Sequence, residues 1–244
     1  VKTDVNGVHI RKDLVDELNL PVDQIKEAET FEEYLENMDL LTQMFQTIHE
    51  AHPELVLVPS SQNPSSFRVT EIPFTDTLGD DLGVLMDGDD QNIVNMYESE
   101  EFKTLTEYMY QWNQDGFILE DAMTTQEAAD TYLKNGRAFG YFETGSDEAT
   151  MEAKVQRTTG YEVVWKKLTK PFVTTNLVNN SAFGISTTSQ HPEAAMKFLN
   201  EMYTNADVVN ILDFGIEGVN WEEKNDGCIG YPDGVSADKS TYDI

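Results

Sequence analysis

Three side chains near the C-terminal end carry groups suited to holding a polar solute by non-covalent contacts. Glu217, Asn220 and Trp221 fall within the stretch GIEGVNW. A tryptophan ring offers a flat apolar face, and a carboxylate and an amide offer hydrogen-bonding groups beside it. Gly215 and Gly218 let the backbone turn sharply and approach a bound molecule closely. The alternative is a helix C-cap followed by a packed tryptophan, and the sequence leaves both interpretations open.

Local patterns predict helices along most of the chain. RKDLVDELN places apolar residues on one face, and Pro21 ends that short helix. Thr30 and Glu33 form a capping box for a long amphipathic helix that runs to His52. A further helix is expected from its cap Ser99 to Gly116, and another from the capping box of Thr124 and Glu127 to Asn135. Two consecutive helices are expected between Pro192 and Phe214.

Short apolar runs between these helices predict strands in ELVLVPSS, RAFGYF, GYEVVWKKL and NLVNNSAFGIS. Two apolar runs around DGDDQN predict a hairpin with Gly88 at its turn. We expect ETGSDE, which follows RAFGYF, to be a loop, and alternation along the strand would bury Phe142. Trp112 is also expected in the core. Strands and helices intermingle along the chain, which favours an α/β fold.

The composition limits the classes of partner. The 244 residues, 39% of them hydrophobic, suffice for one large domain or two small lobes. Sixteen basic against forty-five acidic residues give a formal charge of −29. This charge argues against nucleic acid and anionic membrane surfaces, which both bind basic residues. No apolar run approaches the ~18 residues of a membrane-spanning helix.

Motifs for catalysis or for a cofactor are not found. HEAH at His49–His52 lacks the HExxH spacing of a zinc site, and DGDDQNIVNMYE has Asn92 where a calcium loop needs glycine. Nucleotide-binding, nucleophile-elbow and Cys/His metal patterns are absent as well, so we expect no cofactor and no metal. Cys228, the single cysteine, is expected to be a small packed side chain. A binding protein is therefore favoured over an enzyme.

Several segments, in order, resemble one family. GVHIRKDLVDELNL is similar to its "yRKDlleklg" helix, and VNMYESEEFKTLTEYMYQWNQDGFILEDA to its "vvnlyespefke...mrkWykkGyi..da" stretch. SQHPEAAMKFLNEMYTNADVVNIL and FGIEGVNWE are similar to "sknPEaAmkfLdwlytdpevynll" and "yGiEGkhye". The family is the extracellular solute-binding proteins of ABC importers, family 1, in its Gram-positive lipoprotein, aldouronate-type oligosaccharide-binding branch.

The resemblance implies a type II periplasmic-binding fold, in which an oligosaccharide lies between two hinged lobes. The chain starts inside the family pattern at Val1, so we expect a piece of a longer protein that lacks most of the first lobe. Residues 1–175 would be mainly the second lobe, with a mixed sheet flanked by helices. Residues 176–181 would lie at the crossover, and residues 182–244 would form a helical segment packed on either lobe.

The resemblance also implies which residues contact the solute. The family's contacts often come from the segment after RAFGYF, so Tyr141, Glu143 and Thr144 join the candidates, with Asn179 near the crossover. Sugars combine apolar C–H faces with hydroxyl groups, which suits paired aromatic rings and carboxylates. The full set of expected ligand-binding residues is Tyr141, Glu143, Thr144, Asn179, Glu217, Asn220 and Trp221.

Further expectations concern partners and location. The implied partners are a small solute and the membrane subunits of an ABC importer, and the protein would be a monomeric lipoprotein on a Gram-positive cell surface. Lys166, Lys167 and Lys170 either receive an acidic sugar or are solvated charges at a strand edge. Two alternatives stay open, which are a peptide- or polar-solute-binding protein of the same fold and a secreted glycan-active enzyme.

Overall fold

The computed structural model describes residues 5–59, 72–78, 82–86, 91–145, 147–179, 183–224 and 229–235. The chain consists of two compact units, Val1–Ser181 (unit 1) and Ala182–Ile244 (unit 2). Within the described residues, no helix combines the length and the apolar character that a membrane span requires. The assignment of the units to lobes of a solute-binding fold stays a prediction.

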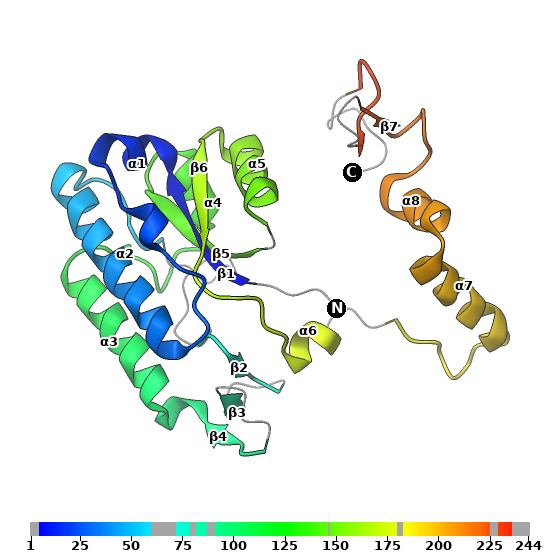
Figure 1. Cartoon of the computed structure of the whole chain (residues 1–244), viewed down its shortest axis with the longest axis horizontal. Coiled ribbons are helices and arrows are strands. Elements are labelled where there is room, and N and C mark those ends of the chain that lie inside the picture. The colour runs from blue at the N-terminus through cyan, green and yellow to red at the C-terminus, as the bar shows by residue number, and fades with distance from the viewer. Residues whose placement is uncertain are drawn as a thin grey trace. The chain divides into compact units, whose positions relative to one another are not determined.

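The main sheet of unit 1 has β1 (Val5–Arg11) at its centre, with β5 (Gly140–Gly145) and β6 (Val163–Lys167) on its two sides (Figure 1). Both neighbours run antiparallel to β1. GYEVVWKKL thus contains a strand as predicted. The loop predicted for ETGSDE is wrong at its start, because residues 143–145 still pair with residues 5–7 of β1 and so continue the strand.

Alternation along β1 gives the sheet two buried faces. Val8 and Ile10 point into the larger core, with Phe142 from β5, and pack against α1 (Lys12–Leu18), α2 (Phe31–Ala51) and α3 (Glu100–Gln114). Phe45 of α2 makes edge contacts with the rings of Trp112 and Phe142. The predicted burial of Trp112 and Phe142 is therefore confirmed.

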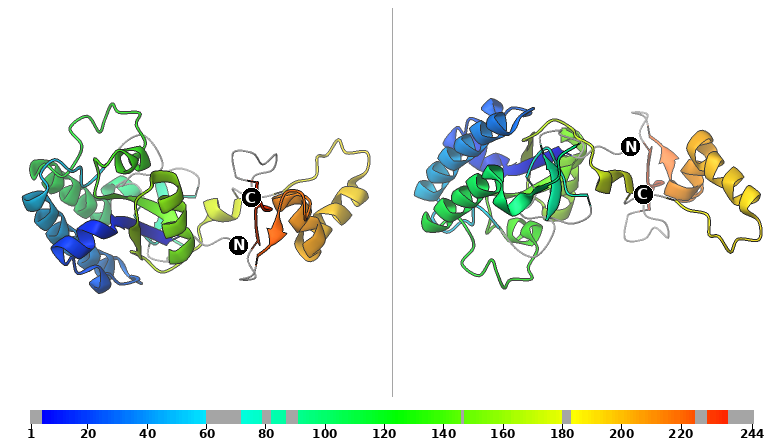
Figure 2. Two further views of the ribbon diagram at one scale, coloured as in Figure 1. Left: turned by 90° about the horizontal axis from the view of Figure 1, so that it is seen from above. Right: turned by 90° about the horizontal axis from the view of Figure 1, so that it is seen from below.

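The opposite face of the sheet packs against α4 (Ala129–Lys134) and α5 (Glu148–Thr159), through residues such as Tyr141, Val155 and Val163. Figure 1 shows α2 and α3 on one side of the sheet and α5 on the other, and Figure 2 gives two further views of the same elements. Unit 1 thus has helices on both faces of one sheet, as the expected α/β class requires.

A second, smaller sheet in unit 1 has the order β2 (Thr75–Asp76), β3 (Gly83–Met86) and β4 (Val94–Asn95). The antiparallel pairing of β3 with β4 confirms the predicted hairpin, whose turn at Gly88 lies outside the described residues. Two single-turn 3-10 helices complete the local structure, η1 (Val22–Gln24) and η2 (Met96–Glu98). The second of them connects β4 to the cap of α3.

The helix ends follow the predicted caps in three places. Thr30 accepts a hydrogen bond from the Glu33 amide at the start of α2, and Ser99 accepts one from the Phe102 amide at the start of α3. Pro192 begins α7 (Pro192–Thr204). Thr30 and Ser99 satisfy amides that have no partner within the helix, whereas Pro192 has no amide hydrogen that would need one.

Three local predictions are wrong. The capping box at Thr124 does not open a helix, because Thr125 turns the chain by accepting from the Glu127 amide and α4 begins only at Ala129. The first residues of NLVNNSAFGIS belong to the short helix α6 (Thr175–Asn179), which begins one residue before this stretch and is held by hydrogen bonds from Thr175 to Asp76. The described residues of ELVLVPSS make isolated parallel bridges at Val56 and Val58 instead of the predicted strand. The mixed sheet expected for this unit is antiparallel in both pairings of β1.

Unit 2 contains α7, α8 (Ala206–Phe214) and a hairpin of β7 (Glu222–Glu223) and β8 (Ile229–Gly230). The two predicted helices are confirmed. Neither helix buries a residue within the described structure, and Phe198 and Ile211 are 52% and 59% exposed. Cys228 lies outside the described residues.

Candidate functional site

A polar cluster on the α5 side of the sheet centres on Glu143 of β5. Its carboxylate accepts hydrogen bonds from His9 of β1, over 3.3 Å, and from Lys154 of α5, over 2.6 Å. The His9 side chain is fully buried, whereas that of Glu143 is 17% exposed. Tyr141 stacks at an angle on His9 with 4.8 Å between ring centroids. The cluster therefore joins three elements at one point of the sheet.

Burial and charge set the protonation of this cluster. Burial of the His9 ring lowers its pKa despite the hydrogen bond to Glu143, so the ring is neutral near pH 7. Burial acts to raise the pKa of Glu143, but hydrogen bonds from His9 and Lys154 outweigh it and hold that pKa below its usual range. Burial, with the Glu143 charge, raises the pKa of Tyr141. Glu143 is thus a fixed negative charge at the edge of a buried site.

The three residues of β5 that were predicted to bind the solute differ in how far they are exposed. Tyr141 is 2% exposed and belongs to the small core between the sheet, α4 and α5. Thr144 pairs with Asn6 of β1 and is exposed. In unit 1 the ring of Tyr141 therefore acts as packing, while the hydroxyl of Thr144 and the exposed part of Glu143 can reach a solute.

The loop after α8 depends on Gly215. This residue caps the helix, donating its amide to the Ile211 carbonyl, and has φ 80° and ψ −146°, which a residue with a Cβ rarely adopts. The Trp221 indole donates to the Gly215 carbonyl over 3.2 Å, and the Asn220 side-chain oxygen accepts from the Ile216 amide over 2.9 Å. The loop is therefore closed by its own side chains.

Trp221 and Glu217, two candidate ligand-binding residues of this loop, differ in their exposure to solvent. Trp221 is 9% exposed and lies edge-on to Phe214 with 6.5 Å between centroids, as expected for a C-cap followed by a packed tryptophan. The Glu217 side chain is exposed. Gly218 donates its amide to the Trp221 carbonyl over 2.7 Å, which places Glu217 and Trp221 at the base of one turn.

The structure brings together Tyr141 and Glu143 in unit 1, and Glu217, Asn220 and Trp221 in unit 2. Asn179 ends α6, and its side chain lies outside the described residues. Each unit is described by itself, so a shared site for the two groups stays a prediction.

Sequence reasoning missed β1 and therefore His9 and the contact to Lys154. The available signal was the alternation in VNGVHIR, where Val5, Gly7 and His9 face one side of the sheet and Val8 and Ile10 the other. The run is short and passes directly into α1, so its pattern is weak without its partners.

The lysines of β6 and Lys170, which follows this strand, are paired with acidic residues that come after α1 in the sequence. Lys166 contacts Asp23 over 3.2 Å, Lys167 contacts Glu27 over 3.7 Å, and Lys170 contacts Glu29. β6 is an edge strand of the three-stranded sheet. These contacts favour the interpretation as edge charges over a site for an acidic sugar.

Comparison with known proteins identifies the fold. A scan of family models gives no match. A carbohydrate ABC transporter substrate-binding protein of Streptococcus pneumoniae serotype 4 is 30% identical over 139 residues, which are 57% of this chain and 28% of that protein. The crystal structure of the N-glycan transport solute-binding protein NgtS from S. pneumoniae superposes with a TM-score of 0.73, at 21% identity, over 95% of this chain and 49% of that one. The chain has the fold of the ABC-importer solute-binding proteins.

Other structures with this solute-binding fold match less closely. The alginate-binding protein AlgQ2, without calcium ion, has a TM-score of 0.51 at 19% identity over 96% of this chain and 47% of its own. FusA of S. pneumoniae, in complex with kestose, has a TM-score of 0.53 at 15% identity over 94% and 47%. The chain thus spans about half the length of these solved structures. The predicted likeness to carbohydrate-binding proteins of ABC importers is confirmed, as is the type II periplasmic-binding fold. The aldouronate-type branch stays a prediction.

Proposed function

We propose that this chain is part of an extracellular solute-binding protein that captures an oligosaccharide for an ABC importer. The observation that carries the proposal is the combined likeness in sequence and fold to a carbohydrate transporter subunit and to NgtS, whose structures contain Man1GlcNAc and Man5GlcNAc. The acidic charge of −29 fits a neutral ligand better than an anionic one.

In this proposal the protein works by closing around its ligand and makes or breaks no bond. A ligand stabilises the closed arrangement only by the free energy with which it prefers closed over open. The membrane subunits of the importer would then recognise the closed form. The protein would act as a monomer outside the cell, anchored as a lipoprotein to a Gram-positive surface.

The contacts we propose divide into two roles. Thr144 and Glu217, which are exposed, and the partly exposed Glu143 would hydrogen-bond sugar hydroxyls. Tyr141 and Trp221 are packed, so their first role is to position these groups. The side-chain oxygen of Asn220 holds the loop at Ile216, and its side-chain nitrogen makes no hydrogen bond to the described residues, so it could donate to a sugar. Asn179 remains a candidate from its place at the end of α6.

Thermal unfolding with a panel of neutral oligosaccharides, oligouronates and peptides tests the proposal. A ligand at 100 times its Kd should add about 2.7 kcal/mol to the free energy of unfolding. We expect neutral oligosaccharides to stabilise the protein. Stabilisation by peptides alone, or reducing-end release from a polysaccharide, would contradict the proposal.

Variants connect the response to the predicted residues. Glu217→Ala should weaken saccharide binding by about tenfold, as for a lost hydrogen bond to a charged group. Glu223→Ala is the matched control, since Glu223 is an exposed carboxylate in the same unit. Equal affinity in the two variants would remove Glu217 from the site.

A further inference from the structure

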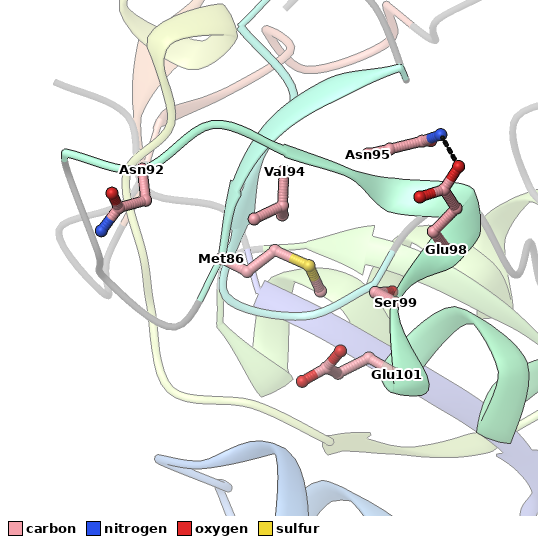
Figure 3. A pocket seen from close by; sticks show the side chains of 7 residues that line it. All are labelled: Met86, Asn92, Val94, Asn95, Glu98, Ser99 and Glu101. Atoms are coloured by element: carbon pink, nitrogen blue, oxygen red, sulfur yellow. Dashed lines mark hydrogen bonds between the residues drawn. The ribbon is translucent and has the colours of Figure 1, made fainter.

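An open pocket of about 630 Å³ lies beside the β3–β4 hairpin in unit 1, and its described lining contains none of the candidate residues considered so far. Figure 3 shows its side chains, contributed by β3, the segment leading into β4, β4 itself, η2, and the cap and first turn of α3. Met86 and Val94 supply apolar surface, and Asn92, Asn95, Ser99, Glu98 and Glu101 supply polar groups. The volume falls in the range of ~300–1,000 Å³ typical of small-molecule sites.

The polar groups at one end of the pocket are held in place before any ligand arrives. The Asn95 side-chain nitrogen donates to Glu98 over 3.1 Å, a contact drawn in Figure 3, and the Asn95 oxygen accepts from the Tyr97 amide over 3.1 Å. The nitrogen and the oxygen of the Asn95 side-chain amide are thereby oriented. Glu98 Oε1 accepts the hydrogen bond from Asn95, and Glu98 Oε2 has no hydrogen-bond partner among the residues that the structure describes. Fixed polar groups lose less entropy when they bind.

The Glu101 carboxylate makes no hydrogen bond or ion pair within the part of the chain that the structure describes. It is half-buried at the pocket, in the first turn of α3. An acceptor-only group at a pocket calls for a ligand that donates hydrogen bonds.

The charge of the pocket excludes anions. Its described lining carries two carboxylates and no basic group. The amides at the start of α3 are also unsuited to an anion, because Ser99 caps the Phe102 amide and Glu100 and Glu101 already complement the helix dipole. Phosphates, sulfates and uronates are therefore disfavoured, and a neutral ligand with several hydroxyl donors and an apolar face is favoured.

We propose that this hairpin pocket binds one ring of a neutral saccharide, with the ring's C–H face on Met86 and Val94 and its hydroxyls on Asn95, Glu98 and Glu101. The proposal rests on the proposed function for the class of ligand. It adds a place of contact on unit 1 whose lining includes no residue of β5.

Titration of the 244-residue chain with saccharides, followed through its amide NMR signals, tests the hairpin pocket and the proposed function separately. The probes are neutral trisaccharides of glucose, mannose and N-acetylglucosamine, with trigalacturonate as the anionic comparison. We expect shifts of the amides of residues 92–101 with a neutral probe and not with trigalacturonate. Shifts confined to residues 141–144 or 215–221 would overturn the hairpin pocket and leave the proposed function standing. No shift anywhere with any saccharide would count against both.

Two conservative variants sharpen the result. Glu98→Gln and Asn95→Ala should each weaken the binding monitored at residues 92–101 by about tenfold, as for one lost hydrogen bond to a charged partner. The matched control is Glu36→Gln, in a different surface groove of unit 1 near Lys26, and it should leave the affinity unchanged. Unchanged affinity in both pocket variants, or shifts produced by Ca²⁺ and abolished by a chelator without any response to sugar, would overturn the proposal.

Discussion

His9 and Glu143 face each other from neighbouring strands, with His9 Nε2 lying 3.3 Å from Glu143 Oε2. Glu143 is ionised and can only accept, so the hydrogen of the neutral imidazole must be on Nε2. His9 Nδ1 is then an acceptor, and it is buried without a hydrogen-bond partner in the structure. The hydrogen bond to Glu143 thus offsets the cost of burying the Nε2–H group of His9 in the centre of the sheet.

Replacing Glu143 tests this dependence. Glu143→Ala should lower the free energy of unfolding by about 1–3 kcal/mol, because it leaves the buried His9 N–H without an acceptor. Urea denaturation measures the change. Glu107→Ala, an exposed carboxylate on α3, should stay within about 0.5 kcal/mol of the unchanged chain. Equal losses of unfolding free energy in the two variants would show that the His9–Glu143 hydrogen bond does not stabilise the fold.

The same pair predicts how stability changes with pH. The pKa of His9 is lower in the folded than in the unfolded chain, so the unfolded state takes up the proton first as pH falls through about 6.5. Stability is then lost below that pH, with a slope of up to about 1.4 kcal/mol per pH unit. The lowered pKa of Glu143 extends the loss below pH 4.5.

His9→Gln should flatten the part of this profile just below pH 6.5, measured by urea unfolding across that interval. The control is His191→Gln, which replaces an exposed histidine and should leave the slope unchanged. A profile that is identical with and without His9 would contradict the assignment of the slope to this residue.

Gly140 lies where β5 passes β1, and an added Cβ would come within 1.8 Å of the His9 carbonyl oxygen. The nearest atoms are all backbone atoms of His9 and Ile10, which cannot turn aside as a side chain could. Gly140→Ala should therefore cost more than the ~1–3 kcal/mol usual for overpacking. Gly184→Ala is the comparison, since nothing lies within 4 Å of the position of its Cβ. Thermal unfolding of both variants checks the prediction, and near-equal midpoints would refute it.

Gly215 combines a left-handed φ of 80° with close packing, because an added Cβ would lie 2.6 Å from the Asn220 side-chain oxygen. Gly215→Ala should therefore disturb the hydrogen bonds of Asn220 and of the Trp221 indole. The indole N–H of Trp221 should shift in the NMR spectrum and exchange faster with solvent.

Gly218 provides the control for that substitution. Its φ of 74° is also positive, but nothing lies within 4 Å of the position of its Cβ. Gly218→Ala should carry only the backbone cost of about 1–2 kcal/mol and keep the indole hydrogen bond. Loss of that bond in both variants would indicate that strain alone, rather than the contact with Asn220, disrupts the loop.

Helix starts could be predicted from the sequence where the interactions that fix them join residues close together in the chain. Thr30 and Ser99 cap their helices as predicted, since a cap needs only a side chain and an amide three residues away. Thr124 failed as a cap because Thr125 competes for the same turn. α6 was mistaken for a strand, and its start is held by Asp76, which lies 99 residues earlier in the chain.

For the candidate site, the sequence indicated which chemical groups are present but did not indicate which of these side chains are exposed to solvent. Tyr141, Glu143 and Trp221 have the groups expected of a sugar site, yet two of them are packed. A side chain's exposure depends on what the rest of the chain places against it, here α4 and α5 around Tyr141 and Phe214 beside Trp221.

The sequence by itself determined the helix faces, most of the caps, the acidic charge and the resemblance to solute-binding proteins, because each of these is a property of neighbouring residues or of a simple sum. Only the tertiary structure decided that VNGVHIR is the central strand and that His9, Glu143 and Lys154 meet. Strand partners are chosen by hydrogen bonds between segments more than 100 residues apart, and such pairings leave little trace in any one segment.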